Sequence, residues 1–330
     1  MALLTVTSHG LYCPAGDFFI DPLRSVDRAV ITHAHSDHAR PGMRAYLTHD
    51  DGVSILRHRL GSTAVISGIA YGERRTINGV GISLHPAGHV VGSAQVRVEH
   101  KGEVWVVSGD YKRQEDPWAT RFEPVRCHTF ITESTFGMPI YRWPSNEAVS
   151  ADIDRWWAGN ADDGRTSILN GYALGKAQRL LGMVDRSIGR IFVSDSVGRI
   201  NDVLLQTGVP LPATERITRH TAVDDLRGAL IISSGSNEEW IDRCTDPSTA
   251  FASGWMAVRG LRRRRSTDLG FIVSDHVDWP DLLRTIADTS AERVLVTHGF
   301  SSTVVRYLKE ECGLAADELT VLYGTNEEDR

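Results

Sequence analysis

Thr32-His33-Ala34-His35-Ser36-Asp37-His38 is the stretch that decides the fold, because it places four potential metal ligands within six positions of one turn. The stretch follows an apolar run at residues 29–31, which predicts a buried strand. In a His-x-His-x-Asp-His cluster, His33 and His35 are two positions apart and point to the same side, toward one metal ion. Asp37 and His38 can then reach a second ion beside it. Imidazole nitrogen together with carboxylate oxygen suits zinc, manganese or iron better than calcium. The alternative, a polar loop that happens to be rich in histidine, is weakened by further ligands downstream.

The further candidate ligands share one local context. Each of them follows a short β-branched or aromatic run that predicts a buried strand. Because sites in α/β proteins form where loops leave the ends of strands, we expect these side chains to gather at one edge. They are His89 after residues 82–84, Asp110 after 104–107, Glu133 after 129–132, His276 after 270–273 and His298 after 293–297. Any one of them alone would more simply be a structural, hydrogen-bonded residue.

The composition is ordinary for a soluble globular protein. The 330 residues are 41% hydrophobic and 24% charged, enough for a sizeable core in two domains. No apolar run approaches the roughly 18 residues of a membrane span, and the amino terminus lacks the features of a signal peptide. Four cysteines without C-x-x-C spacing indicate reduced thiols, so we expect a cytoplasmic protein. The net charge of -6 does not suggest bulk attraction to nucleic acid, so any phosphate binding must be local.

The predicted elements change character along the chain. Residues 1–135 contain many short strands with glycine and proline turns, and one helix over residues 51–59. A helix with an amphipathic pattern then begins after Ser145, which is a typical capping residue. The alternating strands and helices that follow it predict a small parallel α/β domain.

The ligand-bearing pattern returns near the carboxyl end. From about Asp268 the sequence predicts a strand at residues 271–273 and a helix that begins at Trp279. The simplest architecture is therefore one metal-binding domain interrupted by an insert. The predicted bounds are 1–142 and 263–330 for the metal-binding domain and 143–262 for the insert.

Two metal ions need a shared carboxylate and about three further ligands each. Asp110 is the natural bridge, because it is a lone carboxylate at a separate strand end. The ligands assigned to the first metal are His33, His35, His89 and Asp110. The ligands assigned to the second metal are Asp37, His38, Asp110 and His298. Two-metal hydrolytic centres hold their ions about 3.5 to 4 Å apart and activate the attacking water near neutral pH.

His276 and Glu133 remain without a metal in this assignment. Cleavage of a phosphodiester expels a poor alkoxide leaving group, so a general acid assists the reaction. His276 suits that role, with Glu133 orienting its ring and favouring its charged form. We count Asp37 with these two as catalytic; a surface carboxylate is the alternative for Glu133. Asp21 is a candidate acceptor for the second ring N–H of a ligand histidine, or else a plain turn residue.

Two segments carry basic residues that could contact substrate phosphates. Arg259, Arg262 and Arg263 lie in an arginine-rich run beside an aromatic residue, a combination that binds phosphates and stacks on bases. The alternative for this run is a solvated basic loop. Lys176, in Gly-Tyr-Ala-Leu-Gly-Lys at 171–176, opens a helix after a strand and could hold one phosphate. An NTPase is the weaker interpretation, because the segment is one residue short of a phosphate loop and lacks its hydroxyl.

Taken in order, these residues resemble the metallo-β-lactamase fold and, within it, the β-CASP nucleases. The first four motifs of that fold are matched by Asp21, the cluster at 33–38, His89 and Asp110. Motifs A, B and C are matched by Glu133, His276 and His298. The resemblance implies an αββα sandwich with an inserted parallel α/β β-CASP domain, and nucleic acid gripped in the cleft between the two. It also implies that the motif B histidine is the general acid and the motif C histidine a metal ligand.

Short phrases favour one branch of that family. Gly-Leu-Tyr-Cys-Pro (10–14), Gly-Trp-Met-Ala-Val-Arg-Gly (254–260) and Ser-Asp-His-Val-Asp-Trp (274–279) look most like the bacterial ligase-associated DNA damage response exonucleases. Tyr-Ala-Leu-Gly-Lys (172–176) resembles a segment of the crosslink-repair DNA nucleases and slightly favours DNA. The resemblance implies a DNA exonuclease in repair that uses two divalent metal ions. Zinc is the first candidate for these ions, and manganese is the second. A DNA ligase or helicase is its implied partner, and no membrane is involved.

Three other interpretations stay open. The RNA-processing members, ribonuclease J and the mRNA 3′-end cleavage enzymes, share the same catalytic motifs, and the ligand set does not distinguish ribose from deoxyribose. A thioester or β-lactam hydrolase on the same fold is opposed by the insert and by the motif B histidine. A catalytically inactive nucleic-acid-binding scaffold is opposed by the complete ligand set.

Overall fold

The structure is a computed structural model that describes residues 2–235, 239–244, 246–258 and 267–320. The chain divides into two compact units. Unit 1 combines Met1–Tyr141 with His276–Arg330, and unit 2 is Arg142–Asp275. Within the described part of the chain, no helix has the length and apolar character needed to cross a bilayer.

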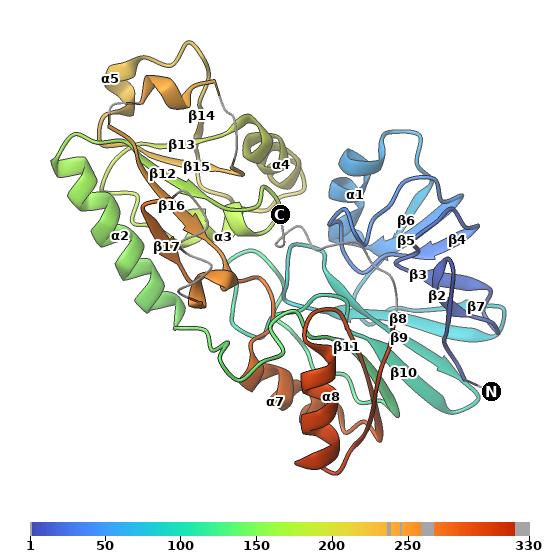
Figure 1. Ribbon diagram of the computed structural model, residues 1–330. Coiled ribbons are helices and arrows are strands. Elements are labelled where there is room, and N and C mark those ends of the chain that lie inside the picture. Colours follow the sequence, from blue (N-terminus) through green and yellow to red (C-terminus); the bar gives the residue numbers. More distant parts are fainter. Residues whose placement is uncertain (1, 236–238, 245, 259–266, 321–330) are drawn as a thin grey trace. The chain divides into compact units, whose positions relative to one another are not determined.

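Unit 1 begins with a six-stranded sheet whose strands are neighbours in chain order (Figure 1). Its first three strands pair antiparallel, and the pairs from the third strand onward are parallel. The strands are β1 (Thr5–Thr7), β2 (Gly10–Cys13), β3 (Phe18–Ile20), β4 (Arg28–Val30), β5 (Ala45–His49) and β6 (Ile66–Ile69). After β5, a 3-10 turn (Asp50–Gly52) leads into helix α1 (Val53–Leu60), which contacts β6.

A second sheet of seven strands completes the β-structure of unit 1. Its order is β19-β18-β11-β10-β9-β8-β7, antiparallel among β7 to β10 and parallel from β10 to β19. Its strands are β7 (Arg74–Ile77), β8 (Val80–Pro86), β9 (Ala94–His100), β10 (Glu103–Val107), β11 (Thr129–Glu133), β18 (Arg293–Thr297) and β19 (Ala315–Glu318). As a consequence β8, β10, β11 and β18 all point the same way, and their carboxyl ends share one edge.

The alternation of side chains along the strands creates two cores in unit 1. On β10, Trp105 and Val107 face the first sheet, where they pack with residues such as Val30 of β4. Val106 lies between them in sequence and faces the opposite side, among Leu282 and Val304. Because successive strand residues point to opposite faces, one buried strand serves both cores. The apolar run of β10 follows from this burial on both sides.

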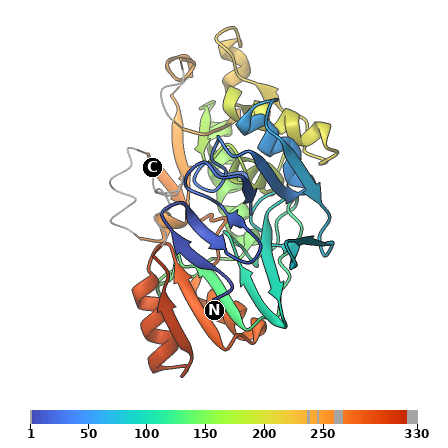
Figure 2. The same cartoon turned by 90° about the vertical axis from the view of Figure 1, so that its right-hand side faces the viewer.

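Helices cover the outer side of the second sheet. Helix α7 (Trp279–Thr289) begins at the cap Asp278, whose side chain accepts a hydrogen bond from the Asp281 amide. Helix α8 (Ser301–Glu310) follows β18 and, in both Figures 1 and 2, lies outside this sheet. Together with α1 on the first sheet, these helices give unit 1 the helix-sheet-sheet-helix layers of the metallo-β-lactamase sandwich.

Unit 2 is a parallel α/β domain. Its six-stranded sheet has the order β14-β13-β15-β12-β16-β17, and its neighbouring strands pair in parallel. The strands are β12 (Ser167–Asn170), β13 (Ile191–Val193), β14 (Glu215–Arg216), β15 (Leu230–Ser233), β16 (Ser248–Ala252) and β17 (Leu269–Phe271). The helices are α2 (Asn146–Asp162), α3 (Lys176–Met183), α4 (Asp195–Gln206) and α5 (Val223–Leu226), with 3-10 turns at Ile241–Arg243 and Gly254–Ala257.

The predicted start of α2 agrees with the structure, but the predicted return to the metal-binding domain is too early. Ser145 caps α2, with its hydroxyl accepting a hydrogen bond from the Ala148 amide at 3.2 Å. The strand expected at residues 271–273 is instead β17, which pairs with β16 in the sheet of unit 2. The chain therefore enters unit 1 again at His276, not at residue 263. Pairing with a neighbouring strand decides this, and the sequence of so short a strand does not reveal its partner.

Candidate metal centre

The candidate ligands of unit 1 lie at one edge of its sheets. The stretch 32–38 directly follows β4 and Ile31, and the backbone carbonyl of Thr32 accepts a hydrogen bond from the Ala94 amide at 2.8 Å. This bond joins the loop after β4 to the start of β9, beside the carboxyl ends of the parallel-pointing strands of the second sheet. The other candidates on those strand ends are His89, Asp110, Glu133 and His298.

Four buried residues form ligand group 1, which is His33, His35, His89 and Asp110. The Nδ1 atom of His35 lies 3.1 Å from His33 Nε2 and 3.0 Å from His89 Nε2. Asp110 Oδ2 is 3.4 Å from His33 Nε2 and 3.8 Å from His89 Nε2. A tetrahedral ion with bonds of about 2.0–2.1 Å needs its ligand atoms about 3.3–3.4 Å apart. The four distances lie on both sides of that spacing, and all four ligand atoms lie within 4.8 Å of one another, so this group could hold a metal ion. It is the set predicted for the first metal.

Ligand group 2 is His38, Asp110 and His298. Asp110 Oδ2 lies 3.5 Å from His38 Nε2, so the same oxygen faces both groups. The predicted fourth ligand, Asp37, stands outside this close group, although its Oδ2 is also 3.5 Å from His38 Nε2. Asp110 therefore belongs to both ligand groups, and its role as a bridge between two ions stays a prediction.

The electrostatics of the centre suit a bound cation. Burial lowers the pKa of His33 well below its usual range, which keeps the ring neutral as a metal ligand requires. Although burial alone would raise it, the charges of His38 and His276 hold the pKa of Asp110 well below its usual range. Asp110 Oδ1 is buried and has no hydrogen-bond partner among the described residues. A buried carboxylate oxygen left in this way is costly unless a cation neutralises it, so the residues fit a metal.

Asp21 contacts His38, one of the candidate ligand histidines. Its Oδ2 lies 2.8 Å from His38 Nδ1, and this contact leaves Nε2 to face Asp110. Asp21 has a φ of 43°, a left-handed conformation that non-glycine residues adopt only when their surroundings impose it. Ionised carboxylates accept the second ring N–H of many metal-binding histidines and fix the ring in place.

His276 and Glu133 form a buried pair beside the ligand groups. His276 Nδ1 lies 2.8 Å from Glu133 Oε2 and 3.0 Å from Oε1. The carboxylate is itself held, since Oε1 accepts the Tyr111 amide at 2.9 Å and Oε2 accepts the Thr135 hydroxyl at 2.5 Å. The His276 ring is centred 5.0 Å from that of His89, so the pair lies next to ligand group 1. Asp110 also lies within 4.8 Å of both residues of the pair.

The position of His276 differs from the expectation that it follows a strand of the metal-binding domain. The preceding strand, β17, belongs to unit 2, and His276 is the first residue after the chain crosses back. The edge of the Phe136 ring packs against the imidazole, with centroids 6.0 Å apart. The side chain is therefore fixed by Glu133 and Phe136 and not by a strand.

The turn that carries His298 depends on a residue that the sequence does not single out. His298 has a φ of 58° and Gly299 a φ of 63°. The Ser134 hydroxyl donates to the carbonyl of His298, and the Ser134 carbonyl accepts the Phe300 amide at 2.9 Å. Ser134 adjoins Glu133 in the chain, so one segment supports both the His276–Glu133 pair and the candidate ligand His298. Only the distant pairing of residues 134 and 298 reveals this role, and no local pattern predicts it.

The predicted phosphate contacts are Lys176 in unit 2 and three arginines outside the described residues. The Lys176 side chain is buried, with its ammonium 3.5 Å from Asp275 Oδ2. Arg179 pairs with the same carboxylate at 2.9 Å. Lys176 is therefore a buried ion-pair residue, and the phosphate contact expected of it at the helix start stays a prediction. Arg259, Arg262 and Arg263 lie outside the residues that the structure describes.

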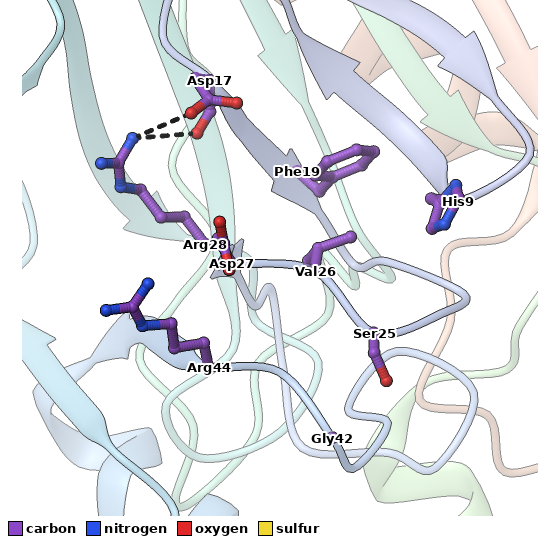
Figure 3. A pocket seen from close by; sticks show the side chains of 9 residues that line it. All are labelled: His9, Asp17, Phe19, Ser25, Val26, Asp27, Arg28, Gly42 and Arg44. Carbon is purple, nitrogen blue, oxygen red and sulfur yellow. Dashed lines mark hydrogen bonds and ion pairs between the residues drawn. The ribbon is translucent and has the colours of Figure 1, made fainter.

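A concavity of about 510 Å³ in unit 1 is separate from the ligands (Figure 3). Arg28 and Arg44 lie on one side of it, and Phe19 and His9 on the other. Arg28 pairs with Asp17 at 3.3 Å, and both side chains are largely exposed. The concavity lies at the amino-terminal ends of β4 and β5, whereas the ligand loop leaves the carboxyl end of β4. It is thus no part of the metal centre.

Comparison with known proteins supplies relatives for the whole chain. No family model matches it. It is similar to a "Probable DNA ligase" of Opitutus terrae, 32% identical over 324 residues, which cover 94% of this chain and 30% of that protein. It is also similar to "Cleavage and polyadenylation specificity factor 73" of Drosophila melanogaster, 28% identical over 60% of this chain and 30% of the relative. "Endoribonuclease ysh-1" of Neurospora crassa is 30% identical over 52% of this chain and 25% of its own length.

These relatives are much longer than the region they share with this chain. The chain spans 30% or less of the length of each of the three. A crystal structure of a protein of unknown function from Enterococcus faecalis V583 matches with a TM-score of 0.62 at 14% identity, covering 90% of this chain and 80% of that one. That similarity supports the fold. With the layers of unit 1, the inserted parallel domain and the ordered ligand motifs, these relatives establish that the chain belongs to the β-CASP nuclease family of the metallo-β-lactamase fold.

Proposed function

We propose that the chain is a two-metal-dependent phosphodiester hydrolase and that it acts on DNA as an exonuclease in repair. The observation that carries the proposal is the single oxygen of Asp110 that faces both ligand groups, with the His276–Glu133 pair beside them. Zinc suits the nitrogen-rich donor set, and manganese is a second candidate. Four thiols without a disulfide favour a cytoplasmic setting.

The chain's own residues divide the chemistry between them. When bound, the two ions would neutralise the charge on the phosphate and activate water for attack. His276 would protonate the departing oxygen from Nε2, because its Nδ1 is held against Glu133. Glu133 orients the ring and stabilises its charged form, while Tyr111 and Thr135 prevent the carboxylate from rotating away. The acid is thus fixed before substrate binds.

DNA is favoured by the relative that covers most of the chain. The protein from Opitutus terrae is named a probable DNA ligase, and 94% of this chain aligns with part of it. An enzyme that trims DNA ends prepares the substrate of a ligase, so we infer that the two activities operate together. A DNA ligase is accordingly the proposed pathway partner. The proposal of a helicase as a second partner rests on family resemblance alone.

RNA is the second candidate substrate because of the other relatives. The Neurospora protein is named an endoribonuclease, and it aligns with about half of this chain. Metal ions held by the ligand groups would contact the phosphate and not the sugar. The same site would therefore serve either DNA or RNA. Only contacts with the 2′-hydroxyl would separate the two.

The test is digestion of matched DNA and RNA oligonucleotides, labelled at either end, with added manganese or zinc. We expect progressive release of mononucleotides from DNA, and the labelled end gives the direction. The double variant Asp37→Ala, His38→Ala should abolish this activity, because both changes remove groups around the second ion. Internal cuts or cleavage of RNA alone would move the chain to the RNA-processing branch.

A matched double variant controls for nonspecific effects. His220→Ala with Asp224→Ala removes the same two residue types from exposed positions of unit 2. This variant should digest DNA at the wild-type rate. Absence of cleavage of either polymer by the metal-loaded wild type would overturn the proposed activity.

A further inference from the structure

One buried hydroxyl group connects the two ligand groups. Thr32 is 1% exposed and precedes the first ligand histidine. Its Oγ1 lies 2.6 Å from Asp21 Oδ2 and 3.1 Å from His33 Nδ1. Its backbone amide donates to Asp21 Oδ1 at 2.8 Å. The side chain therefore sits between a carboxylate and an imidazole ring, in contact with both.

The number of hydrogen atoms fixes the direction of these bonds. A hydroxyl group has one proton to donate, whereas an ionised carboxylate has none. The proton of Thr32 therefore goes to Asp21, and toward His33 the hydroxyl oxygen can only accept. A neutral imidazole carries a single ring proton, so that of His33 must lie on Nδ1. The lone pair is then on Nε2, which is the atom that faces Asp110 Oδ2 at 3.4 Å.

The same carboxylate oxygen sets the ring of a ligand in the other group. Asp21 Oδ2, which accepts from Thr32, also lies 2.8 Å from His38 Nδ1. Donation from Nδ1 directs the Nε2 atom of His38 toward Asp110 Oδ2, 3.5 Å away. Asp21 and Thr32 thus orient one histidine in each ligand group, and both histidines face the same bridging oxygen.

The packing around Thr32 leaves it little freedom to move. Gly109, with a φ of 56°, approaches so closely that a Cβ atom there would lie 2.7 Å from Thr32 Cβ. Gly109 precedes Asp110 in the chain, so the threonine also contacts the loop that carries the bridge. A hydroxyl group confined in this way cannot rotate toward another partner without loss of the bond to His33.

We propose that Thr32 is a positioning residue that fixes the ring tautomer of His33 and, through Asp21, ties the geometry of the two metal sites together. The proposal rests on the proposed function only in requiring that the two ligand groups bind metal. Residues behind a metal ligand typically change metal affinity about 10- to 100-fold when they are replaced. Removal of the Thr32 hydroxyl should therefore weaken binding at both sites, although Thr32 touches neither ion.

The test compares isosteric and conservative variants with Zn²⁺ alone as the probe. In competition with a chelator, Thr32→Val should bind Zn²⁺ about 10- to 100-fold more weakly at both sites. Thr32→Ser keeps the hydroxyl and should restore affinity to near the wild-type value. Thr48→Val is the matched control, because Thr48 is equally buried nearby on β5 and donates to the carbonyl of Ile31. Wild-type affinity in Thr32→Val would overturn the proposal.

A spectroscopic measurement on the metal-free wild type needs no variant to fold. The nitrogen-15 shifts of the histidine rings report which ring nitrogen carries the proton, and His33 should be protonated at Nδ1. A His33 proton on Nε2 would contradict the proposal even if Thr32→Val does not fold. Neither measurement uses a substrate, so failure of the nuclease assay and failure of this proposal are distinguishable.

Discussion

At the residue scale, the His276–Glu133 pair shows how a histidine outside both ligand groups would be held for the proposed reaction. The ring is buried, and Glu133 contacts it at Nδ1 with both carboxylate oxygens. Tyr111 and Thr135 hold that carboxylate in turn. The carboxylate therefore orients the ring through Nδ1, in addition to the packing of Phe136 against it.

Loss of the proposed general acid, His276, should lower the cleavage rate without lowering the metal content. We expect His276→Ala to lower the rate of DNA cleavage about 10²- to 10⁴-fold, the usual contribution of a general acid. Glu133→Gln should lower it less, because the amide still fills the space. Both variants should retain the metal content of the wild type. Cleavage rates measured together with metal analysis check this, and His58→Ala, an exposed change on α1, should have no effect. A wild-type rate in His276→Ala would exclude the histidine as the acid.

The two metal sites should differ in their dependence on pH. Burial opposes the charge on His38, but Asp110, Asp37 and Asp21 outweigh it and raise the pKa of His38 well above its usual range. Burial instead lowers the pKa of His33 well below its usual range. A metal must displace a proton from Nε2 of His38 but meets none on Nε2 of His33. As the pH falls, the second ion should therefore leave first, which metal content measured across a pH series will show. Loss of the first ion before the second would contradict this order.

At the element scale, the end of β18 shows how backbone strain is retained for a ligand. His298 and Gly299 are both left-handed, and Ser134 holds the turn through its hydroxyl and its carbonyl. Glycine adopts this conformation freely, but for His298 it persists only where the surroundings impose it, and such residues concentrate at functional sites. The segment that follows β11 thus shapes the loop that follows β18, its neighbour in the sheet.

A methyl group added at this turn should be harmful for two reasons. A Cβ atom at Gly299 would lie 2.3 Å from the Ser134 carbonyl oxygen, and its φ of 63° is unfavourable for alanine. We expect Gly299→Ala to lower the free energy of unfolding by more than about 1 kcal/mol and to weaken the second metal site. Gly313→Ala is the matched control, since it has a φ of 64° but nothing within 4 Å. Denaturant unfolding of both variants checks this; equal losses would show that the contact with Ser134 is unimportant.

At the scale of the whole molecule, the sequence predicts the layers of the fold and the order of its ligands. This works because each ligand follows an apolar strand, and such strands converge at a shared edge. It fails where distant pairs decide the outcome. Lys176 has the sequence context of a phosphate contact, yet its side chain is buried and its ammonium pairs with Asp275. Pairing with β16 likewise assigns β17 to unit 2.

The residues that hold the candidate ligands in place also cannot be predicted from the sequence. Thr32 and Ser134 are ordinary polar residues in their local context, and their roles come from contacts with Asp21 and His298. The candidate ligands themselves can be recognised in the sequence, because few residue types other than histidine, cysteine, aspartate and glutamate bind metal ions. A hydroxyl that orients a ligand has many other uses, so only its position in space identifies it.

The most direct test of the two-metal account is the rate of DNA cleavage as Mn²⁺ is titrated into the metal-free protein. Because Asp110 serves both ligand groups and each ion supports the same reaction, the account predicts little cleavage at one equivalent of metal and the full rate at two. Full activity at one equivalent, or activity that does not depend on added metal, would contradict it.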